Sequence, residues 1–314
     1  MLHPRLAARL TVACAVVALL AAGCGDDGDV ATDTTTSTVA PTTTDSIPPD
    51  STVPAAASHD VGVYFVAPVG EPAAGGVVDA LVASLRTVEL EGDATPDMLA
   101  EAAFAAVLDG PTELEAETGY GTTVPAATVL GGVTVTDGVA TIELSGDFEA
   151  PSGAFTDTLR VAQVVFTLTA VDGIDAVRFS IDGVVRDVIG THGVEVDAEN
   201  GAVRDDIPEA RPPILVEHPA AGAVVGDPLE VSGESNTFEA NVRWALTDPD
   251  GLILDEGFTT ATSGSGTWGT FEFTVPVGPV DRAGLGALIL WEDSAEDGRQ
   301  VNIVEVPVMF DEPT

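Results

Sequence analysis

The stretch from Gly132 to Gly183 constrains the fold of this chain more than any other part of it. Apolar and polar residues alternate on both sides of Asp137-Gly138, a dipeptide that favours a two-residue β-hairpin turn. Four apolar residues then recur at the spacing of one helical face: Val161, Val164, Val165 and Leu168. A third alternating run, Val177 to Ile181, ends at Asp182-Gly183. Two strands, a helix laid across them and a third strand predict one α/β core.

The residues before this core predict two more strands and another helix. The runs VGVYFV, from Val61, and SLRTVEL, from Ser84, have strand patterns. Thr95-Pro96 has the cap and first-turn proline that open a helix, and Gly110-Pro111 would end it. The order strand, strand, helix, strand, strand, helix, strand predicts an α/β layer with helices on one face of a small sheet. The buried stripe expected for the first helix is Leu99, Ala102, Ala103, Ala106 and Val107.

Residues 214–311 follow a different pattern. Seven short alternating runs are separated by turn-forming residues, and none has a helical period. This pattern predicts a β-sandwich, with Trp244 and Trp291 contributing to its core. Pro212-Pro213 ends an acidic linker, because neither proline continues a helix across the join.

Residues 1–23 predict a lipoprotein signal peptide. Two arginines precede an apolar run, 10–20, that is too short to span a bilayer as a stable helix. The segment ends Leu-Ala-Ala-Gly-Cys24, which resembles a bacterial lipobox, although Ala21 stands where leucine is usual. The alternative is an ordinary secretory signal with a chance cysteine. Because Cys14 is removed with the signal, Cys24 would have no disulfide partner, and lipidation would explain why a single cysteine is present.

Residues 24–59 are predicted to be the lipidated Cys24 followed by a disordered tether. This segment is rich in Thr, Ser and Pro and has no apolar period, so it cannot bury enough surface to fold. At about 3.1 Å per residue, it would reach on the order of 100 Å when fully extended. The expected location is the extracytoplasmic face of the cell membrane, where two acyl chains give stable anchoring.

The charge balance argues against nucleic acid as a partner. The chain carries 51 acidic and 11 basic residues, a formal net charge of −40, and all of its basic residues are arginines. A field of this sign repels phosphate backbones and anionic lipid headgroups. Adaptation to high salt and a GC-rich genome would each produce such a composition, and the sequence leaves both open.

No set of residues predicts catalysis, a cofactor or a metal. The match GSGTWG at 264–269 precedes a strand pattern instead of a helix, so it is interpreted as a loop and not as a nucleotide site. His59, His192 and His218 lie in separate segments without a triad pattern. Two acidic turns remain open as calcium ligands or as turns that bond their own backbone: Asp248 with Asp250, and Asp293 with Glu296 and Asp297. We therefore predict that the chain is not an enzyme.

Three polar or aromatic residues stand out in the first domain. Arg160 and Arg178 interrupt apolar runs and are interpreted as solvent-facing positions. Tyr120 lies in the glycine-rich loop GYGTT and is a possible partner contact, since exposed aromatic side chains on loops anchor interfaces. The alternative is that Tyr120 packs down as a lid on the first helix.

Several of these segments resemble a known domain. VYFV, RTV, LDGPT, GVTVTDGVATIEL, RVAQVVFTLT and IDAVRFSIDG stand in the order of the sporulation and spore germination (GerMN) domain. The resemblance covers about residues 60–200. It implies an extracytoplasmic, non-enzymatic module that takes part in assembling complexes, and the family also occurs in lipoproteins of actinobacteria.

The second domain resembles a module that accompanies the first. NTFEANVRWALTDPDG and LWEDSAEDGRQVN are similar to the immunoglobulin-like domain of bacterial spore germination proteins. The predicted organisation is a signal peptide at 1–23, the tether at 24–59, a GerMN-like α/β (α+β) domain at 60–200, a linker at 201–213 and an all-β immunoglobulin-like sandwich at 214–311.

The predicted function is that of a lipid-anchored scaffold or adaptor in a cell-envelope complex of the sporulation or germination type. Its partners would be the membrane and an envelope protein of unknown identity. The alternative function is a lipoprotein that binds cell-wall glycan or a small solute, which would require a groove rimmed by aromatic residues.

Overall fold

The computed structural model describes residues 56–69, 78–278, 280 and 282–311. The predicted signal peptide, Cys24 and all but the last four residues of the predicted tether lie outside these residues. None of the helices formed by the described residues has the length and apolar character needed to cross a bilayer.

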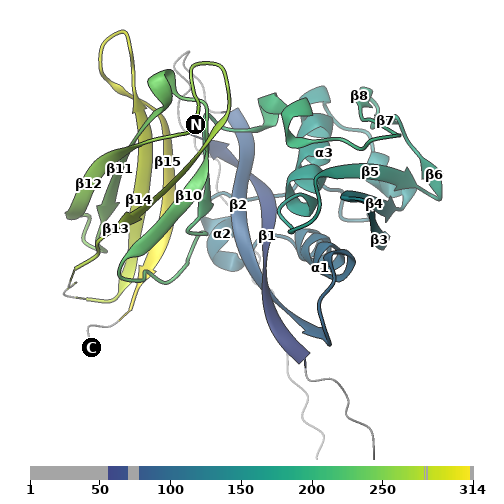
Figure 1. The fold of residues 1–314 in the computed structure, drawn as a ribbon, viewed down its shortest axis with the longest axis horizontal. Coiled ribbons are helices and arrows are strands. Elements are labelled where there is room, and N and C mark those ends of the chain that lie inside the picture. The colour runs from purple at the N-terminus through teal and green to yellow at the C-terminus, as the bar shows by residue number, and fades with distance from the viewer. Residues whose placement is uncertain (1–55, 70–77, 279, 281, 312–314) are drawn as a thin grey trace, which may run out of the picture. The chain divides into compact units, whose positions relative to one another are not determined.

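The first domain contains two larger β-sheets, a small two-stranded sheet and two long helices (Figure 1). Strands β1 (Ala56–Val69) and β2 (Val78–Glu91) pair with each other in an antiparallel hairpin. The second sheet has the order β3-β4-β5-β6. Its strands are β3 (Leu130–Thr136), β4 (Val139–Leu144), β5 (Ala176–Ile181) and β6 (Val184–Val185). The helices are α1 (Pro96–Asp109), α2 (Glu113–Glu117) and α3 (Ala154–Leu168), and a small ribbon pairs β7 (Val188–Ile189) with β8 (Val194–Glu195).

The predicted order of strands and helices is confirmed, but the single small sheet is wrong. Helix α1 contacts β1, β2 and β3, and helix α3 contacts β1, β2 and β5, so both helices pack against both sheets. The reason lies in α3, which buries residues of every face from Leu159 to Leu168. A helix that is enclosed on all sides needs a second layer, and the β1–β2 hairpin supplies it. This hairpin begins at Ala56, four residues before the predicted start of the domain.

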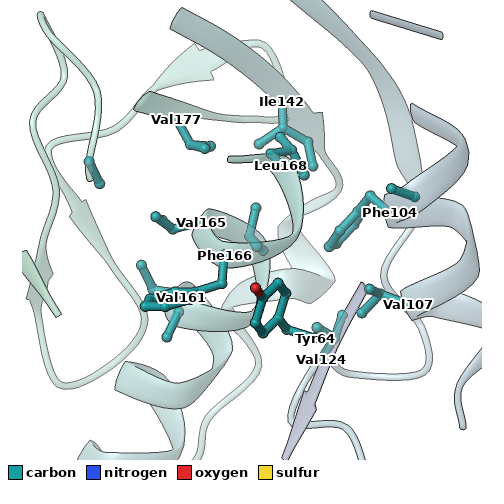
Figure 2. Packing of buried hydrophobic residues seen from close by; sticks show 14 of the residues in the cluster. Tyr64, Phe104, Val107, Val124, Ile142, Val161, Val165, Phe166, Leu168 and Val177 are labelled. Carbon is teal, nitrogen blue, oxygen red and sulfur yellow. The ribbon is translucent and has the colours of Figure 1, made fainter. Parts of the chain in front are cut away.

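The βαβ unit at the centre agrees with the predicted core. Strands β4 and β5 pair in parallel, and α3 makes the connection between them. Asp137 and Gly138 have φ values of 50° and 80°, as a two-residue hairpin turn between β3 and β4 requires. Figure 2 shows side chains from both sheets and both helices converging in one core, among them Tyr64, Phe104, Ile142 and Val165.

The buried face of α1 differs from the predicted stripe. Ala100, Ala103, Phe104 and Val107 are buried, whereas Leu99, Ala102 and Ala106 are half-buried. The observed face has the i, i+3, i+4, i+7 spacing and is centred on Phe104, which the predicted stripe omitted. A large aromatic ring decides the orientation of the helix, since alanines on either side bury little area.

The second domain is a sandwich of two antiparallel sheets, as predicted. One sheet has the order β13-β10-β9 and the other β12-β11-β14-β15. Its inward side chains include Val242, Leu246, Phe271, Val308 and Phe310, all buried. Its strands are β9 (Ile214–His218), β10 (Leu229–Ser235), β11 (Asn241–Thr247), β12 (Ile253–Thr260), β13 (Gly269–Val275), β14 (Gly284–Asp293) and β15 (Gln300–Phe310), one for each predicted run.

Short helix α2 is held by a charged cluster around Glu115. Thr112 and Glu115 form a reciprocal capping box: the Glu115 amide donates to Thr112 Oγ1 at 3.3 Å, and the Thr112 amide donates to Glu115 Oε2 at 2.7 Å. Arg86 of β2 donates to both Glu115 oxygens, at 2.6 and 2.9 Å, and Ser84 donates to Oε1. Burial raises the pKa of Glu115, but these hydrogen bonds outweigh it and hold the pKa below its ordinary value of 4.5.

The observed stripe of α1 can be tested by mutation. Phe104→Ala should lower the free energy of unfolding by about 3–5 kcal/mol, because the ring is fully buried and its loss leaves a cavity. Leu99→Ala, on the predicted stripe and only half-buried, should cost clearly less. Urea denaturation of the two variants makes the comparison. Equal losses would contradict the observed orientation of the helix.

The charge on Glu115 predicts a pH dependence of stability. The pKa of Glu115 is lower in the folded state than in the unfolded state, so its contribution is present above pH 4.5 and disappears as the pH falls below that value. The stability difference between wild type and Glu115→Gln should therefore shrink between about pH 5 and pH 3. Denaturation at several pH values measures it. Glu117→Gln, an exposed change in the same helix, is the control and should show no such trend.

Candidate functional site: the arginine junction

Residues 53–314 belong to one unit of tertiary contacts, and an ionic network joins the two domains inside it. We call this network the arginine junction; it consists of Tyr64, Arg204, Asp205, Arg211, Glu217, Glu234 and Trp268. Arg204 lies at its centre. Its Nη1 donates to Glu217 and to Glu234, both at 2.9 Å. Its Nε donates to Thr169 Oγ1 at 2.9 Å, immediately after helix α3.

Aromatic rings of the first domain enclose the Arg204 guanidinium. Its carbon lies 4.9 Å from the ring centre of Phe166 and 5.4 Å from that of Tyr64. The Tyr64 hydroxyl donates to Glu217 of β9, so a residue of β1 also bonds directly to the second domain. Burial raises the pKa of Tyr64 well above its ordinary value, while the nearby Arg204 charge lowers it. Burial lowers the pKa of Arg204, but the charges of Tyr64 and Glu217 outweigh it, so the net direction is upward.

Arg211 extends the junction towards Trp268. Its Nη1 donates to Glu234 and its Nη2 to Asp205, each at 2.9 Å. Its guanidinium carbon lies 4.0 Å from the ring centre of Trp268, within cation–π distance. Arg211 is 6% exposed, and its Nε has no hydrogen-bond partner among the described residues. A buried guanidinium with one unsatisfied donor adjoins the cavity described below.

The predicted linker, 201–213, folds tightly enough to position both arginines. Ala202 bridges to Val177 of β5, and two short 3-10 turns follow at Arg204–Asp206 and Pro208–Ala210. Gly201 has a φ of 85°, and a Cβ there would come within 3.0 Å of Ala176 Cβ and Val177 N. The segment therefore begins against β5, and its two 3-10 turns then contact α3, the second of them also contacting β2.

A cavity of about 430 Å³ opens at the junction. Its lining comes from both domains and is mainly polar. Arg204, Arg211, Asp205 and Glu234 form part of it, and Asp175, Thr262, Trp268 and Thr270 form much of the rest. Pockets of this size at domain boundaries are common places for small ligands.

The ionic groups of the junction are arranged for binding and not for proton transfer. Both arginines donate to carboxylates, and Glu217 and Glu234 each accept from Arg204. A general base needs a carboxylate oxygen free to accept a proton from a substrate, whereas these carboxylates already accept hydrogen bonds from the arginines. The junction can hold two domains together and can offer hydrogen bonds to a ligand.

Tyr120, the predicted partner contact, lies away from this junction. It follows α2, is half-buried and packs against the core of the first domain. Burial, together with the Glu115 charge, raises the pKa of Tyr120 to about 12. Its ring lines a second cavity, with Pro68 of β1 and Pro307 of β15. The role of Tyr120 in contacting a partner stays a prediction.

The structure brings Ser152, Asp157 and His192 together, although no triad pattern is visible in the sequence. His192 Nδ1 lies 3.0 Å from Asp157 Oδ2, and Ser152 Oγ donates to Asp157 Oδ1. Both bonds therefore end on the aspartate. Nucleophilic catalysis needs the serine hydroxyl bonded to the histidine, so this arrangement is not that of a hydrolase triad. Arg160 Nη1, 3.3 Å away, balances the buried Asp157 charge.

The interpretation of Arg160 as solvent-facing is wrong. Arg160 is 3% exposed and donates to the carbonyls of Thr123, Phe148 and Ala150 at 3.0, 2.8 and 3.1 Å. Arg178 is half-buried and donates to the carbonyls of Ala198 and Glu199, just after the β7–β8 ribbon. In both places an arginine satisfies loop carbonyls that have no strand or helix partner.

The acidic turns bond their own backbone. Asp248 Oδ1 accepts from the amides of Asp250 and Leu252 at 2.9 and 2.8 Å. Asp297 Oδ1 accepts from the amide of Arg299 at 3.3 Å. Among the described residues no group of three or more possible metal ligands converges. The loop at 264–269 leads into strand β13, in agreement with its interpretation as a loop.

Comparisons with known families agree with both resemblances seen in the sequence. Residues 62–187 match the family described as "Sporulation and spore germination". Residues 213–299 match the family described as "Immunoglobulin-like domain of bacterial spore germination". No curated protein matches the chain.

Three solved structures show distant likenesses. A candidate lipoprotein from Clostridium perfringens is 18% identical, with 49% of this chain and 93% of that one covered and a TM-score of 0.32. The first GerMN domain of the sporulation protein GerM from Bacillus subtilis is 19% identical, with coverages of 47% and 98% and a TM-score of 0.32. The tandem GerMN domains of the same protein are 16% identical, with coverages of 72% and 64% and a TM-score of 0.34.

The arginine junction predicts that the two domains unfold together. Arg204→Ala would remove the cation that Glu217 and Glu234 share, while Tyr64 still bonds Glu217 and Arg211 still pairs with Glu234, so the change should cost about 1–3 kcal/mol. The single unfolding transition should then separate into two, one for each domain. Calorimetry measures this. Arg282→Ala is the control, because its ion pair with Asp250 is more than half exposed and should contribute less than about 1 kcal/mol. An unchanged single transition in Arg204→Ala would contradict the role of the junction.

Proposed function

We propose that this chain, which carries a sporulation and spore germination domain followed by an immunoglobulin-like domain of the bacterial spore germination type, is a non-enzymatic adaptor of the cell envelope. The observation that carries the proposal is the arginine junction, which ties these two domains to each other. A linked pair presents a fixed arrangement of surfaces to a partner, as an adaptor in a complex needs.

The non-enzymatic part of the proposal is supported by how the ionisable groups are used. Arg204 and Arg211 bind their carboxylates in the junction, and Asp157 binds Arg160, Ser152 and His192. These groups already have hydrogen-bonded partners within the fold. The descriptions of the two matching families refer to sporulation and spore germination, and neither description names a reaction.

The proposed location is the extracytoplasmic face of the membrane, with a lipid on Cys24. Its support is the signal-type leader with its lipobox-like end. The acidic residues, 51 in all, would keep the folded part away from anionic headgroups, so the tether would have to carry the attachment. The envelope partner is a protein of unknown identity.

The anchor can be tested with a single substitution. Wild-type protein should be found in the membrane fraction and move to the detergent phase, because acyl chains supply the only membrane affinity proposed. Cys24→Ala should remain in the aqueous phase. Cys14→Ala is the matched control and should behave as wild type, since that residue is removed with the signal. Mass spectrometry of a wild-type N-terminus that shows an unmodified Cys24 would contradict the anchor.

The adaptor role needs a separate experiment. Crosslinking in intact cells, with wild type and Arg204→Ala compared, should capture the same envelope protein with wild type and less of it with the variant. The expected loss follows from separation of the two domains while each stays folded. Equal capture by both forms would show that the fixed arrangement is not what the partner recognises.

A further inference from the structure

The glycines of the loop at 264–269 allow close backbone packing, and this packing positions Trp268. A Cβ on Gly264 would lie 2.5 Å from the backbone of Ala240 and Thr237, and one on Gly269 would lie 2.2 Å from Ser263 N. These glycines therefore allow backbone segments to approach closely. The one large side chain of the loop is Trp268, which is half-buried and lines the cavity of the arginine junction.

Trp268 is held in a defined position. The Arg211 guanidinium packs on the indole ring at 4.0 Å from its centre, and Arg211 is fixed in turn by Glu234 and Asp205. Close backbone packing holds the loop on one side, and a buried ion network holds the ring on the other. An aromatic ring that is positioned before a ligand arrives loses little entropy on binding.

The polar groups around Trp268 offer unused hydrogen-bonding capacity. Thr262 and Thr270 are exposed; their hydroxyls bond each other at 3.3 Å and Thr262 Oγ1 also accepts from the Thr270 amide at 2.9 Å, which leaves one hydroxyl hydrogen to donate. Asp205 remains 81% exposed although one of its oxygens accepts from Arg211. Asp175 is exposed at the cavity, and nothing in the described part of the chain bonds to its carboxylate. Arg211 Nε is buried, and no group in the described ranges accepts a hydrogen bond from it.

These groups disfavour three classes of ligand: anions, purely apolar molecules and multivalent metals. An anion would meet Asp175, Asp205 and Glu234, and both arginines are already neutralised by carboxylates. A purely apolar molecule would leave the polar lining unsatisfied. A multivalent metal would need a convergent set of oxygens, and the described residues contain no such cluster. A neutral molecule with many hydroxyl groups and an apolar face fits all of these groups.

We propose that the cavity of the arginine junction binds a neutral saccharide. A sugar ring would place its C–H face on the side of the Trp268 ring that Arg211 does not cover, and its hydroxyls would donate to the carboxylates of Asp175 and Asp205. The threonine hydroxyls would serve as donors or acceptors. The volume of about 430 Å³ accommodates one or two sugar rings, so a chain of sugars would leave the cavity along its open side. This inference does not rest on the proposed adaptor role or on the anchor.

The test follows the indole N–H resonances of the three tryptophans by NMR in the full chain. The probes are a β-1,4-linked N-acetylglucosamine tetramer, cellotetraose and, as an organic cation, tetramethylammonium. At least one of the two sugars should shift the Trp268 resonance in a saturable manner, while Trp244 and Trp291, both buried in the sandwich, stay unchanged. Neither sugar shifting Trp268, or the cation alone shifting it, would overturn the proposal.

Two variants and a control make the test specific. Trp268→Ala should weaken sugar binding at least about tenfold, as measured by calorimetry, because it removes the central aromatic contact. Asp175→Ala should weaken it about threefold and leaves the Arg211–Trp268 contact intact, so its effect does not depend on stability of the junction. Leu252→Ala, an exposed apolar change outside the cavity, should bind as wild type. Undiminished affinity in both cavity variants would overturn the site.

Discussion

The fold depends on how a very acidic chain pairs its few cations. Every basic residue is an arginine, and the chain holds 11 of them against 51 acids. Four occupy the interior or its edge: Arg86 binds Glu115, Arg160 binds Asp157, and Arg204 and Arg211 share Glu234. Removing a charge from water is costly unless it is paired and hydrogen-bonded. The planar guanidinium meets this requirement because it offers several donors in a fixed geometry. A lysine ammonium is a compact charge whose donors are not fixed in this way. The remaining acids can then stay at the surface, where solvent screens their repulsion.

Sequence patterns predicted the parts of the fold that depend on local periodicity. The Asp137-Gly138 hairpin, the apolar face of α3 and the seven strands of the sandwich all follow from spacing and turn chemistry. Spacing does not reveal that the polar face of α3 is also buried. Gln163 Nε2 donates to the Tyr64 carbonyl at 3.0 Å, and the Tyr64 amide donates to Thr167 Oγ1 at 3.1 Å, so these side chains bond the backbone of β1. A periodic pattern treats every polar residue as solvated, whereas tertiary contacts with a distant hairpin decide the matter here.

The candidate site was harder to predict, because it is built from residues that are far apart in sequence and that local rules assign to loops. The segment 201–213 reads as a linker from its acids and prolines, but it contains Arg204 and Arg211 in a chain poor in cations. The small number of cations was the signal that could have indicated the site, because two arginines within eight residues of an acidic segment are expected to pair with carboxylates. Both arginines form such pairs with glutamates of the second domain. The segment 264–269 was correctly predicted to be a loop. Its glycine pattern suggested only a test for a nucleotide site, and the sequence analysis gave no role to Trp268, the residue that the glycines position.

The junction also connects the two proposals physically. The cavity is lined by Asp175 and Arg204 from one side of the domain boundary and by Thr262 and Trp268 from the other, so it exists only while the domains are joined. A ligand that binds this closed form and not an open one stabilises the joined state by mass action. If an adaptor partner that contacts both domains also favours the joined state, the ligand and the partner must raise each other's affinity by the same factor. The ionic network that compensates the buried charges would in this way couple ligand binding in the cavity to partner binding at the surface of the two domains.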